Sequence, residues 1–143
     1  MSNRIVAAVV AALVSGGLCA CSSGSSGQTA NATVTIDRNA VRIAHVKCGQ
    51  QEWYRTIDVG DDKAGATIVI DERSVPMTAK SVRIHNVGGF TGMWSEDGPD
   101  AAGGPAKASF GGSTYTVSGT ANGSKSDDST QAASADFKIV ATC

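Results

Sequence analysis

The sequence predicts an all-β protein, in which one domain forms a single antiparallel β-sandwich or barrel-like sheet of about eight short strands. Apolar residues recur with a period of two from Ala32 onward, a pattern typical of half-buried strands. Turn-forming residues, many of them among the 17 glycines, interrupt this pattern at regular intervals. A helix is hard to place, although residues 74–80 could form a single turn. Regularly spaced short strands are typical of sandwiches and barrels.

The first three predicted strands follow one another closely at the start of the domain. Residues 33–36 alternate between polar and β-branched apolar side chains, and residues 41–48 form the second strand. Residues 52–59 form the third strand, which contains the clustered aromatic residues Trp53 and Tyr54. Because side chains alternate along a strand, each segment is expected to cover the core with one face.

Three further strands are predicted at residues 66–71, 81–86 and 90–94. The first is a nearly continuous run of apolar, β-branched residues, which indicates a central strand. The second alternates, and the third is a candidate edge strand that contains Trp94. A loop with several glycines and prolines, residues 97–105, is expected after it.

The last three candidate strands are residues 106–110, 113–120 and 135–143. Large apolar side chains alternate along the last two of them, so each should present one face to the core. Residues 122–131 lie between these two strands and are polar, which favours a loop. The total is eight or nine short strands.

The composition limits the size of the core and excludes one class of partner. The chain has 143 residues, a formal net charge of −1 and only 5% aromatic residues. Core volume must therefore come mainly from Val, Ile and Ala, which leaves little room for an internal cavity. No stripe of basic residues runs along the chain, so nucleic acid is not an expected partner.

The N-terminus has the order of a bacterial lipoprotein signal. Arg4 precedes an apolar stretch, residues 5–18, which is shorter than the roughly 20 residues of a membrane-spanning helix. The sequence Leu18-Cys19-Ala20-Cys21 then matches a lipobox, so cleavage is expected between Ala20 and Cys21, with Cys21 acylated. An uncleaved anchor and a secreted protein without lipid are the alternatives.

These features divide the chain into three parts. Residues 1–20 are the cleaved signal peptide, residues 21–31 are the acylated cysteine and a flexible Ser/Gly tether, and residues 32–143 are the β domain. The tether spans about 18 Å root-mean-square. The sequence therefore predicts a protein held by lipid on the extracytoplasmic side of the cell membrane, with its domain close to the bilayer.

Two cysteines, Cys48 and Cys143, remain in the domain. In an exported domain this number favours one disulfide, formed in an oxidising compartment. A loop of about 95 residues would stabilise the folded state by about 4 to 5 kcal/mol in the chain-entropy model. Two free thiols are the alternative.

No pattern in the sequence indicates catalysis, a metal site or a cofactor. His45 and His85 lie on predicted strands and lack metal-ligand spacing with a cysteine or a second histidine. Trp53, Tyr54 and Trp94 are candidate ligand-contact aromatics, with a place in the core or over the sheet as the alternative. We therefore expect a protein that is not an enzyme.

Several segments of the domain have a familiar form: Val46-Lys47-Cys48, Lys80-Ser81-Val82, Asn86-Val87, Gly112-Ser113, Gly119-Thr120-Ala121 and the ending Phe137-Lys138-Ile139-Val140-Ala141-Thr142-Cys143. Together they resemble the mycobacterial nineteen-kilodalton lipoprotein antigen family, the LpqH-like lipoproteins. The resemblance extends over residues 34–143, which is most of the domain.

The resemblance implies a lipid-anchored protein of the cell envelope with no known catalytic activity. It also implies that the host Toll-like receptor 2 senses the acylated N-terminus, and that the protein acts as a surface antigen or adhesin. Better-known members have a longer, Thr-rich and glycosylated tether, and residues 21–31 depart from that pattern. An envelope lipid or glycolipid carrier, with the sheet around an apolar cavity, is the alternative function.

Overall fold

The computed structural model describes residues 30–143. The predicted signal peptide, the cleavage site and Cys21 lie outside the described residues. Within the described part, no helix is both long and apolar enough to cross a membrane.

The described residues form an all-β domain, as the alternating pattern predicts. The strands and one short 3-10 helix are, in chain order, β1 (Ala32–Ile36), β2 (Asn39–Ile43), β3 (Val46–Gln51), β4 (Tyr54–Gly60), β5 (Gly65–Asp71), β6 (Thr78–Val87), β7 (Phe90–Ser95), η1 (Pro99–Gly103), β8 (Lys107–Gly111), β9 (Thr114–Lys125) and β10 (Asp128–Thr142). Ten strands form instead of the eight or nine expected, because the predicted strand over residues 41–48 divides into β2 and β3.

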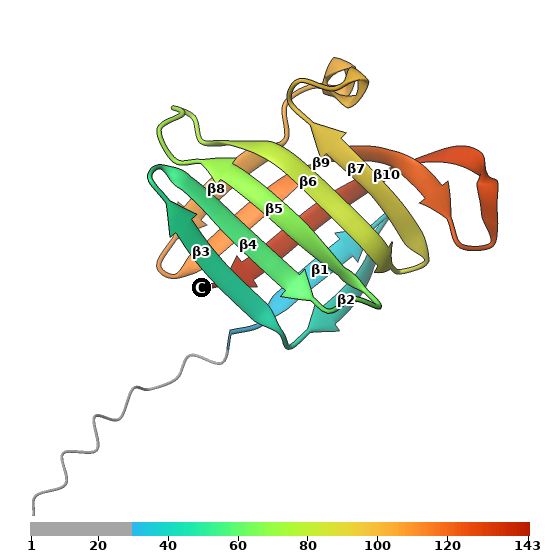
Figure 1. The fold of residues 1–143 in the computed structure, drawn as a ribbon, viewed down its shortest axis with the longest axis horizontal. Helices are drawn as coiled ribbons and strands as arrows, with labels where there is room; N and C mark the ends of the chain where they lie inside the picture. The colour runs from blue at the N-terminus through green and yellow to red at the C-terminus, as the bar shows by residue number, and fades with distance from the viewer. Residues whose placement is uncertain (1–29) are drawn as a thin grey trace, which may run out of the picture.

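The strands form one antiparallel sheet that folds over into two layers. Its order is β2-β1-β10-β9-β7-β6-β5-β4-β3, and β8 pairs with β9 and briefly with β6. Figure 1 shows the strands of the two layers crossing at a large angle, with β3 to β7 in front of β1, β2, β9 and β10. The layers stay connected through the pairing of β7 with β9, and β2 and β3 are the free edges.

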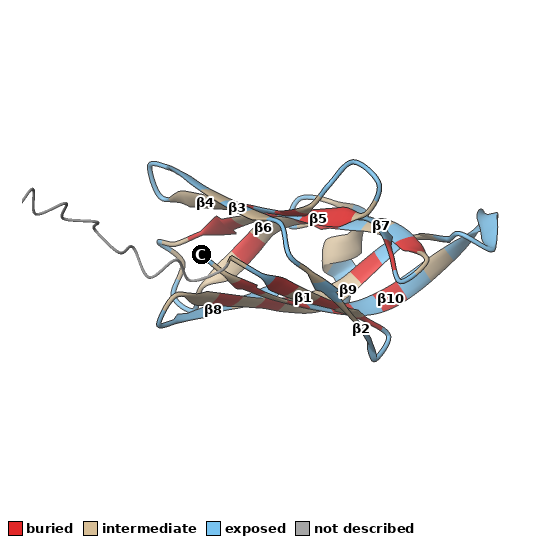
Figure 2. Cartoon of the chain, turned by 90° about the horizontal axis from the view of Figure 1, so that it is seen from below, coloured by how far each residue is buried: buried red, intermediate tan, exposed pale blue. Residues whose placement is uncertain are grey.

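The core lies between the layers, where the inward side chains of both meet (Figure 2). β1 is an example, because it buries Ala32, Val34 and Ile36 and leaves the two threonines between them half-buried. The largest fully buried side chains come from both layers: Trp94, Phe90, Ile57, Ile68, Ile70, Ile84 and Ile139. Small and β-branched residues fill most of the remaining space, as the composition requires.

Two glycines permit the close approach of strands where the sheet passes from one layer to the other. Gly92 of β7 pairs with Gly123 of β9. A Cβ atom on Gly123 would lie 1.9 Å from the carbonyl oxygen of Thr91, and one on Gly92 would lie 2.5 Å from the ring of Phe90. Neither position can hold a side chain without movement of the backbone or the core.

The prediction of one strand over residues 41–48 is wrong. The chain leaves β2 at Ile43, passes Ala44 and His45 in an open corner, and begins β3 at Val46. The two strands lie at opposite edges of the sheet. A period-two pattern continues across the corner, so it does not reveal that the chain changes layers there.

The predicted helical turn at residues 74–80 is also wrong. This segment is a loop that leads into β6, where Thr78 pairs with Asp71 of β5 and with Lys107 of β8. A 3-10 turn occurs instead at Pro99–Gly103, inside the predicted loop. Proline in the first turn suits this site, because its fixed φ angle is helical and its missing N–H would have no partner there.

The predicted polar loop at residues 122–131 is mostly strand. β9 extends to Lys125, and β10 begins at Asp128, so the two form a long hairpin whose exposed end projects at the right of Figure 1. The register shifts between Asp128 and Ala133. Polar residues can form strands here because both faces meet solvent and the backbone groups pair with each other.

Candidate functional site

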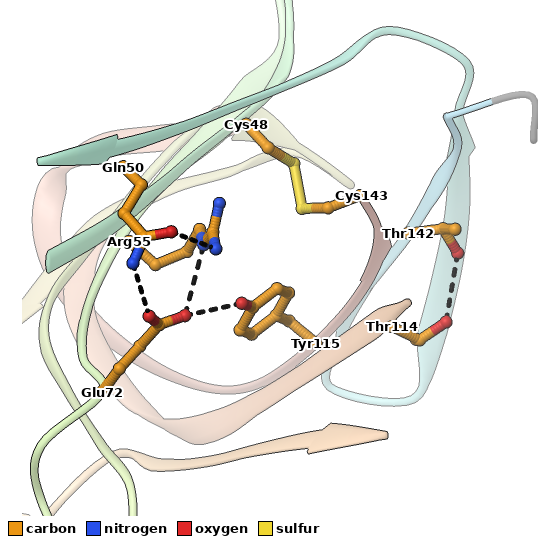
Figure 3. Close-up of a disulfide and its surroundings, with 8 residues drawn as sticks. All are labelled: Cys48, Gln50, Arg55, Glu72, Thr114, Tyr115, Thr142 and Cys143. Atoms are coloured by element: carbon orange, nitrogen blue, oxygen red, sulfur yellow. Dashed lines mark hydrogen bonds and ion pairs between the residues drawn. A yellow bond between two sulfur atoms is a disulfide. The ribbon is translucent and has the colours of Figure 1, made fainter. Parts of the chain in front are cut away.

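A disulfide closes the open side of the sandwich. Cys48 of β3 is bonded to Cys143, which follows β10, and their Cα atoms are 5.9 Å apart. The bond therefore joins the free edge strand of one layer to the C-terminus of the other (Figure 3). This is the pair of cysteines that the sequence predicts to be bonded.

A network of polar side chains lies beside this disulfide, centred on the carboxylate of Glu72. The hydroxyl of Tyr115 donates to Oε1 of Glu72 at 2.6 Å, and Nε of Arg55 donates to the same oxygen at 3.2 Å. Nε2 of Gln50 donates to the other carboxylate oxygen at 3.0 Å, and Arg55 donates back to Gln50 at 2.6 Å. Figure 3 shows the four side chains pointing toward one another.

The charged and polar groups of the network are paired with one another. Burial raises the pKa of the Tyr115 phenol, and its hydrogen bond to Glu72 acts in the same direction. The phenol therefore stays protonated and serves as a donor, while Arg55 balances the carboxylate of Glu72. Because each group is paired within the network, the arrangement joins the β5–β6 loop to β4 and β9.

A second cluster of side chains lies on the outside of the same end. The guanidinium of Arg73 lies 4.5 Å from the ring centre of Trp53 and 5.8 Å from that of Tyr54. It also binds Asp71 through two hydrogen bonds of 3.2 and 3.1 Å. These contacts raise the pKa of Arg73 and lower that of the Asp71 carboxyl, chiefly through the side-chain hydrogen bond.

The three candidate ligand-contact aromatics do not form one face. Trp53 is 42% exposed in the β3–β4 turn, and Tyr54 follows it half-buried at the start of β4. Trp94 is 1% exposed, and its Nε1–H donates to the carbonyl oxygen of Gly104 at 3.3 Å. Trp94 is therefore a core residue, and Trp53 is accessible to a partner.

The two histidines lie at surface hollows of about 260 and 650 Å³ near the β4–β5 turn. Both are exposed, and two of the carboxylates beside them, Asp58 and Asp61, are held by other groups. Asp61 accepts the backbone N–H groups of Lys63 and Ala64, which lowers its pKa, and Asp58 accepts the hydroxyl of Thr67. Among residues 30–143, no group of three or more His, Cys, Asp or Glu side chains is arranged to hold a metal ion.

Two further exposed residues were not singled out in the sequence. Val75 is 98% exposed in the β5–β6 loop, and Phe110 is 50% exposed at the end of β8, with its ring centre 4.4 Å from that of Tyr115. The sequence offers one signal for the exposure of Val75, since this valine precedes a proline in a segment expected to connect two strands. Phe110 gives no such signal, because a strand residue of either face fits the alternating pattern.

The chain is similar to known proteins over its whole length. The family model of the Mycobacterium 19 kDa lipoprotein antigen matches residues 25–143. Two relatives assigned as lipoproteins, from Mycobacterium avium subsp. hominissuis and Mycobacterium indicus pranii, are 49% and 46% identical. The protein assigned as lipoprotein LppE of Mycobacterium tuberculosis is 35% identical. Each comparison covers 100% of this chain and 97 to 100% of the relative.

Proposed function

The chain belongs to the mycobacterial 19 kDa lipoprotein antigen family, and we propose that it is a non-enzymatic surface lipoprotein, anchored by an acyl group on Cys21. The lipobox Leu18-Cys19-Ala20-Cys21 is the observation that carries the proposal. Signal peptidase cuts between Ala20 and Cys21, and the acylated cysteine becomes the first residue. The domain then lies on the extracytoplasmic side of the cell membrane.

Two features of the domain support this location. The Cys48–Cys143 disulfide is compatible with an oxidising compartment outside the cytoplasm. The first strand begins at Ala32, about ten residues after the acylated cysteine, which leaves the sequence of a short polar tether between them.

The acylated N-terminus is also the proposed signal to the host. The lipid supplies a group that the receptor Toll-like receptor 2 recognises, and the exposed domain supplies the surface for antibodies or adhesion. Two or three acyl chains hold a protein stably in a membrane, because each buried methylene contributes about 0.8 kcal/mol.

Membrane fractionation of two cysteine variants tests the anchor. We expect Cys21→Ala to move the protein from the membrane to the soluble fraction and to remove the mass of the acyl chains. Cys19→Ala is the matched control, since Cys19 leaves with the signal peptide and its loss should change neither location nor mass. Membrane retention of Cys21→Ala protein at unchanged mass would refute the proposal.

A reporter-cell assay tests the host signal separately. Purified wild-type protein should activate cells that express Toll-like receptor 2, and Cys21→Ala protein at the same concentration should not. Equal activation by the wild-type and Cys21→Ala proteins would show that the domain or a contaminant activates the receptor, and would refute the role of the lipid.

A lipid or glycolipid carrier is the second candidate, favoured by one apolar hollow of about 390 Å³. It lies on the outer surface of β6, β7 and β9, and Ile84, Met93 and two glycines line part of it. The space between the layers is occupied by buried side chains, so a lipid would have to lie on the surface. Organic extraction of purified Cys21→Ala protein should yield a stoichiometric lipid if the carrier function is correct.

A further inference from the structure

Three turns of the domain expose large apolar side chains at one end of the molecule. Trp53 is 42% exposed in the β3–β4 turn, Val75 is 98% exposed in the β5–β6 loop, and Phe110 is 50% exposed beside the β8–β9 turn. We call these three residues the apolar rim. They are three of the four exposed large apolar residues in the described part of the chain, and the fourth is Met93 on β7.

Hydrogen bonds link the three turns to one another. The backbone N–H of Glu72 donates to the carbonyl oxygen of Trp53 at 3.0 Å, which joins the β5–β6 loop to the β3–β4 turn. Tyr115 donates to Glu72 and packs against Phe110, which adds the β8–β9 turn. All three turns lie at the left of Figure 1, near the C-terminus.

The chain enters the domain beside the strand ends that carry Phe110, and on its other side it lies against the β2–β3 corner and the β4–β5 turn. The carbonyl oxygen of Asn31 accepts the N–H of Thr142, Thr142 pairs with Thr114, and Thr114 pairs with Gly111. These residues form a row across the ends of β1, β10, β9 and β8. Phe110 is next to the last of them, so it lies about 14 Å from the tether attachment, at three strand spacings of about 4.8 Å each.

The length of the tether keeps this end near the bilayer. The sequence places ten residues from Cys21 to Ala30, and a Gly/Ser chain of ten residues spans about 18 Å root-mean-square. An acyl group on Cys21 would therefore hold Phe110, the rim residue beside the tether attachment, within reach of the lipid surface. This step rests on the lipid anchor proposed above.

The chemistry of the rim suits the interface between lipid and water. Tryptophan side chains are enriched at the headgroup level of a membrane, because the apolar part of the ring contacts the hydrocarbon while the polar N–H stays near water. Two of the neighbouring cations are paired with carboxylates, Arg73 with Asp71 and Arg55 with Glu72. Contact with lipid would leave these two pairs intact, while the exposed carboxylate of Glu52 would stay on the water side of the headgroups.

We propose that Trp53, Val75 and Phe110 insert into the headgroup region of the bilayer that carries the acyl anchor, so that the domain docks on the membrane in one orientation. The occupant of the rim is the lipid surface itself. The long β9–β10 hairpin, which projects from the opposite end in Figure 1, then points away from the membrane. The proposal gives the domain a fixed presentation to partners outside the cell.

Quenching of tryptophan fluorescence by brominated lipids tests the docking. The purified acylated protein is reconstituted in phosphatidylcholine vesicles, and flotation first establishes that it is anchored. Lipids brominated near the headgroup should then lower the emission of Trp53 roughly twofold. Trp53→Phe is the control, because it leaves only Trp94, whose buried ring should not be quenched.

Three exposed-residue variants separate insertion from a structural role. Val75→Ser and Phe110→Ser should each reduce the quenching of Trp53, since each removes part of the inserted surface. Ala132→Ser is the control, because it replaces an exposed apolar residue of β10 in the hairpin at the opposite end of the domain and should leave quenching unchanged. Circular dichroism establishes that all three variants are folded.

The outcomes distinguish the two proposals. Failure of the wild-type protein to float would refute the lipid anchor. Flotation without bromolipid quenching of Trp53 would refute docking and leave the anchor intact. Protection of Trp53 from acrylamide that grows with protein density, without bromolipid quenching, would identify a second copy of the chain as the occupant and would also refute docking.

Discussion

At the level of single residues, Tyr115 is the side chain that connects the disulfide end of the core to the surface network. Its ring is 3% exposed, and its hydroxyl donates to a carboxylate that Arg55 and Gln50 also hold. Tyr115 therefore packs its ring in the core and holds the β5–β6 loop in place through the hydrogen bond to Glu72.

Replacing Tyr115 by phenylalanine should destabilise the domain. The change removes a hydrogen bond to a charged acceptor, which typically costs about 1.5 to 3 kcal/mol, and it leaves the ring in place. Urea unfolding followed by fluorescence measures the difference in unfolding free energy. Tyr54→Phe is the control, because it removes a hydroxyl from a half-buried tyrosine outside the Glu72 network and should have a smaller effect.

Asp71 gives a prediction for pH dependence. Hydrogen bonds from the side chain and backbone N–H of Arg73 lower the pKa of its carboxyl in the folded state. A lowered folded pKa stabilises the protein above the unfolded pKa, which is about 4, and this stabilisation is lost as pH falls through the folded pKa. The stability difference between wild type and Asp71→Asn should therefore be constant near neutral pH and shrink in acid.

Carboxyl-carbon NMR of the wild-type protein checks this assignment directly. The titration midpoint of Asp71 should lie below that of an ordinary aspartate, because Arg73 favours its charged form. A midpoint at or above the ordinary value would show that the ion pair does not persist in solution.

At the level of elements, the junction of β7 and β9 decides whether the sheet can fold into two layers. Gly123→Ala should destabilise the domain by about 3 kcal/mol, because the new Cβ atom would meet the backbone of Thr91 and force the strands apart. Gly49→Ala in β3 is the matched control, since open space surrounds that position and the change should stay within about 0.5 kcal/mol. Thermal unfolding of both variants provides the measurement.

Alternation along the sequence identifies strands better than it identifies their ends. The predicted strands 33–36, 66–71 and 113–120 correspond to β1, β5 and β9, from which they differ by a few residues at the ends. The corner at Ala44 and His45 cannot be read from alternation, because the pattern continues across it. Alternation also fails to predict the polar start of β10 near Asp128, because both faces of the strand are exposed there and no apolar residues alternate with polar ones.

At the level of the whole molecule, the disulfide holds the two layers together at the side where the sheet is open. It joins residues 95 positions apart in the sequence, so it restricts the unfolded chain strongly. Because β3 has a neighbour on one side only, the bond also ties down a free edge.

Replacing both cysteines by serine should lower the unfolding free energy by up to about 4 to 5 kcal/mol, the value of the chain-entropy model for a loop of this length. Urea unfolding of the double variant against the oxidised wild type measures the loss. Reduction of the wild type with dithiothreitol should give the same midpoint as the double variant. A midpoint unchanged by either treatment would show that the bond contributes little.

The sequence by itself determined the all-β class, most of the strands and the pairing of Cys48 with Cys143. It could do so because alternation reports which side chains are buried, and because only two cysteines remain after the predicted signal segment. It also predicts a lipobox that ends at Cys21, which lies outside the described residues.

Only the tertiary structure decided how the strands pair and what their turns bring together. Alternation says nothing about which strands are neighbours, so the folding of one sheet into crossed layers was not visible in the sequence. That folding separates Trp94 from Trp53, burying the first and exposing the second. It also gathers Trp53, Val75 and Phe110 at one end of the domain, because turns distant in sequence meet wherever the two layers end together.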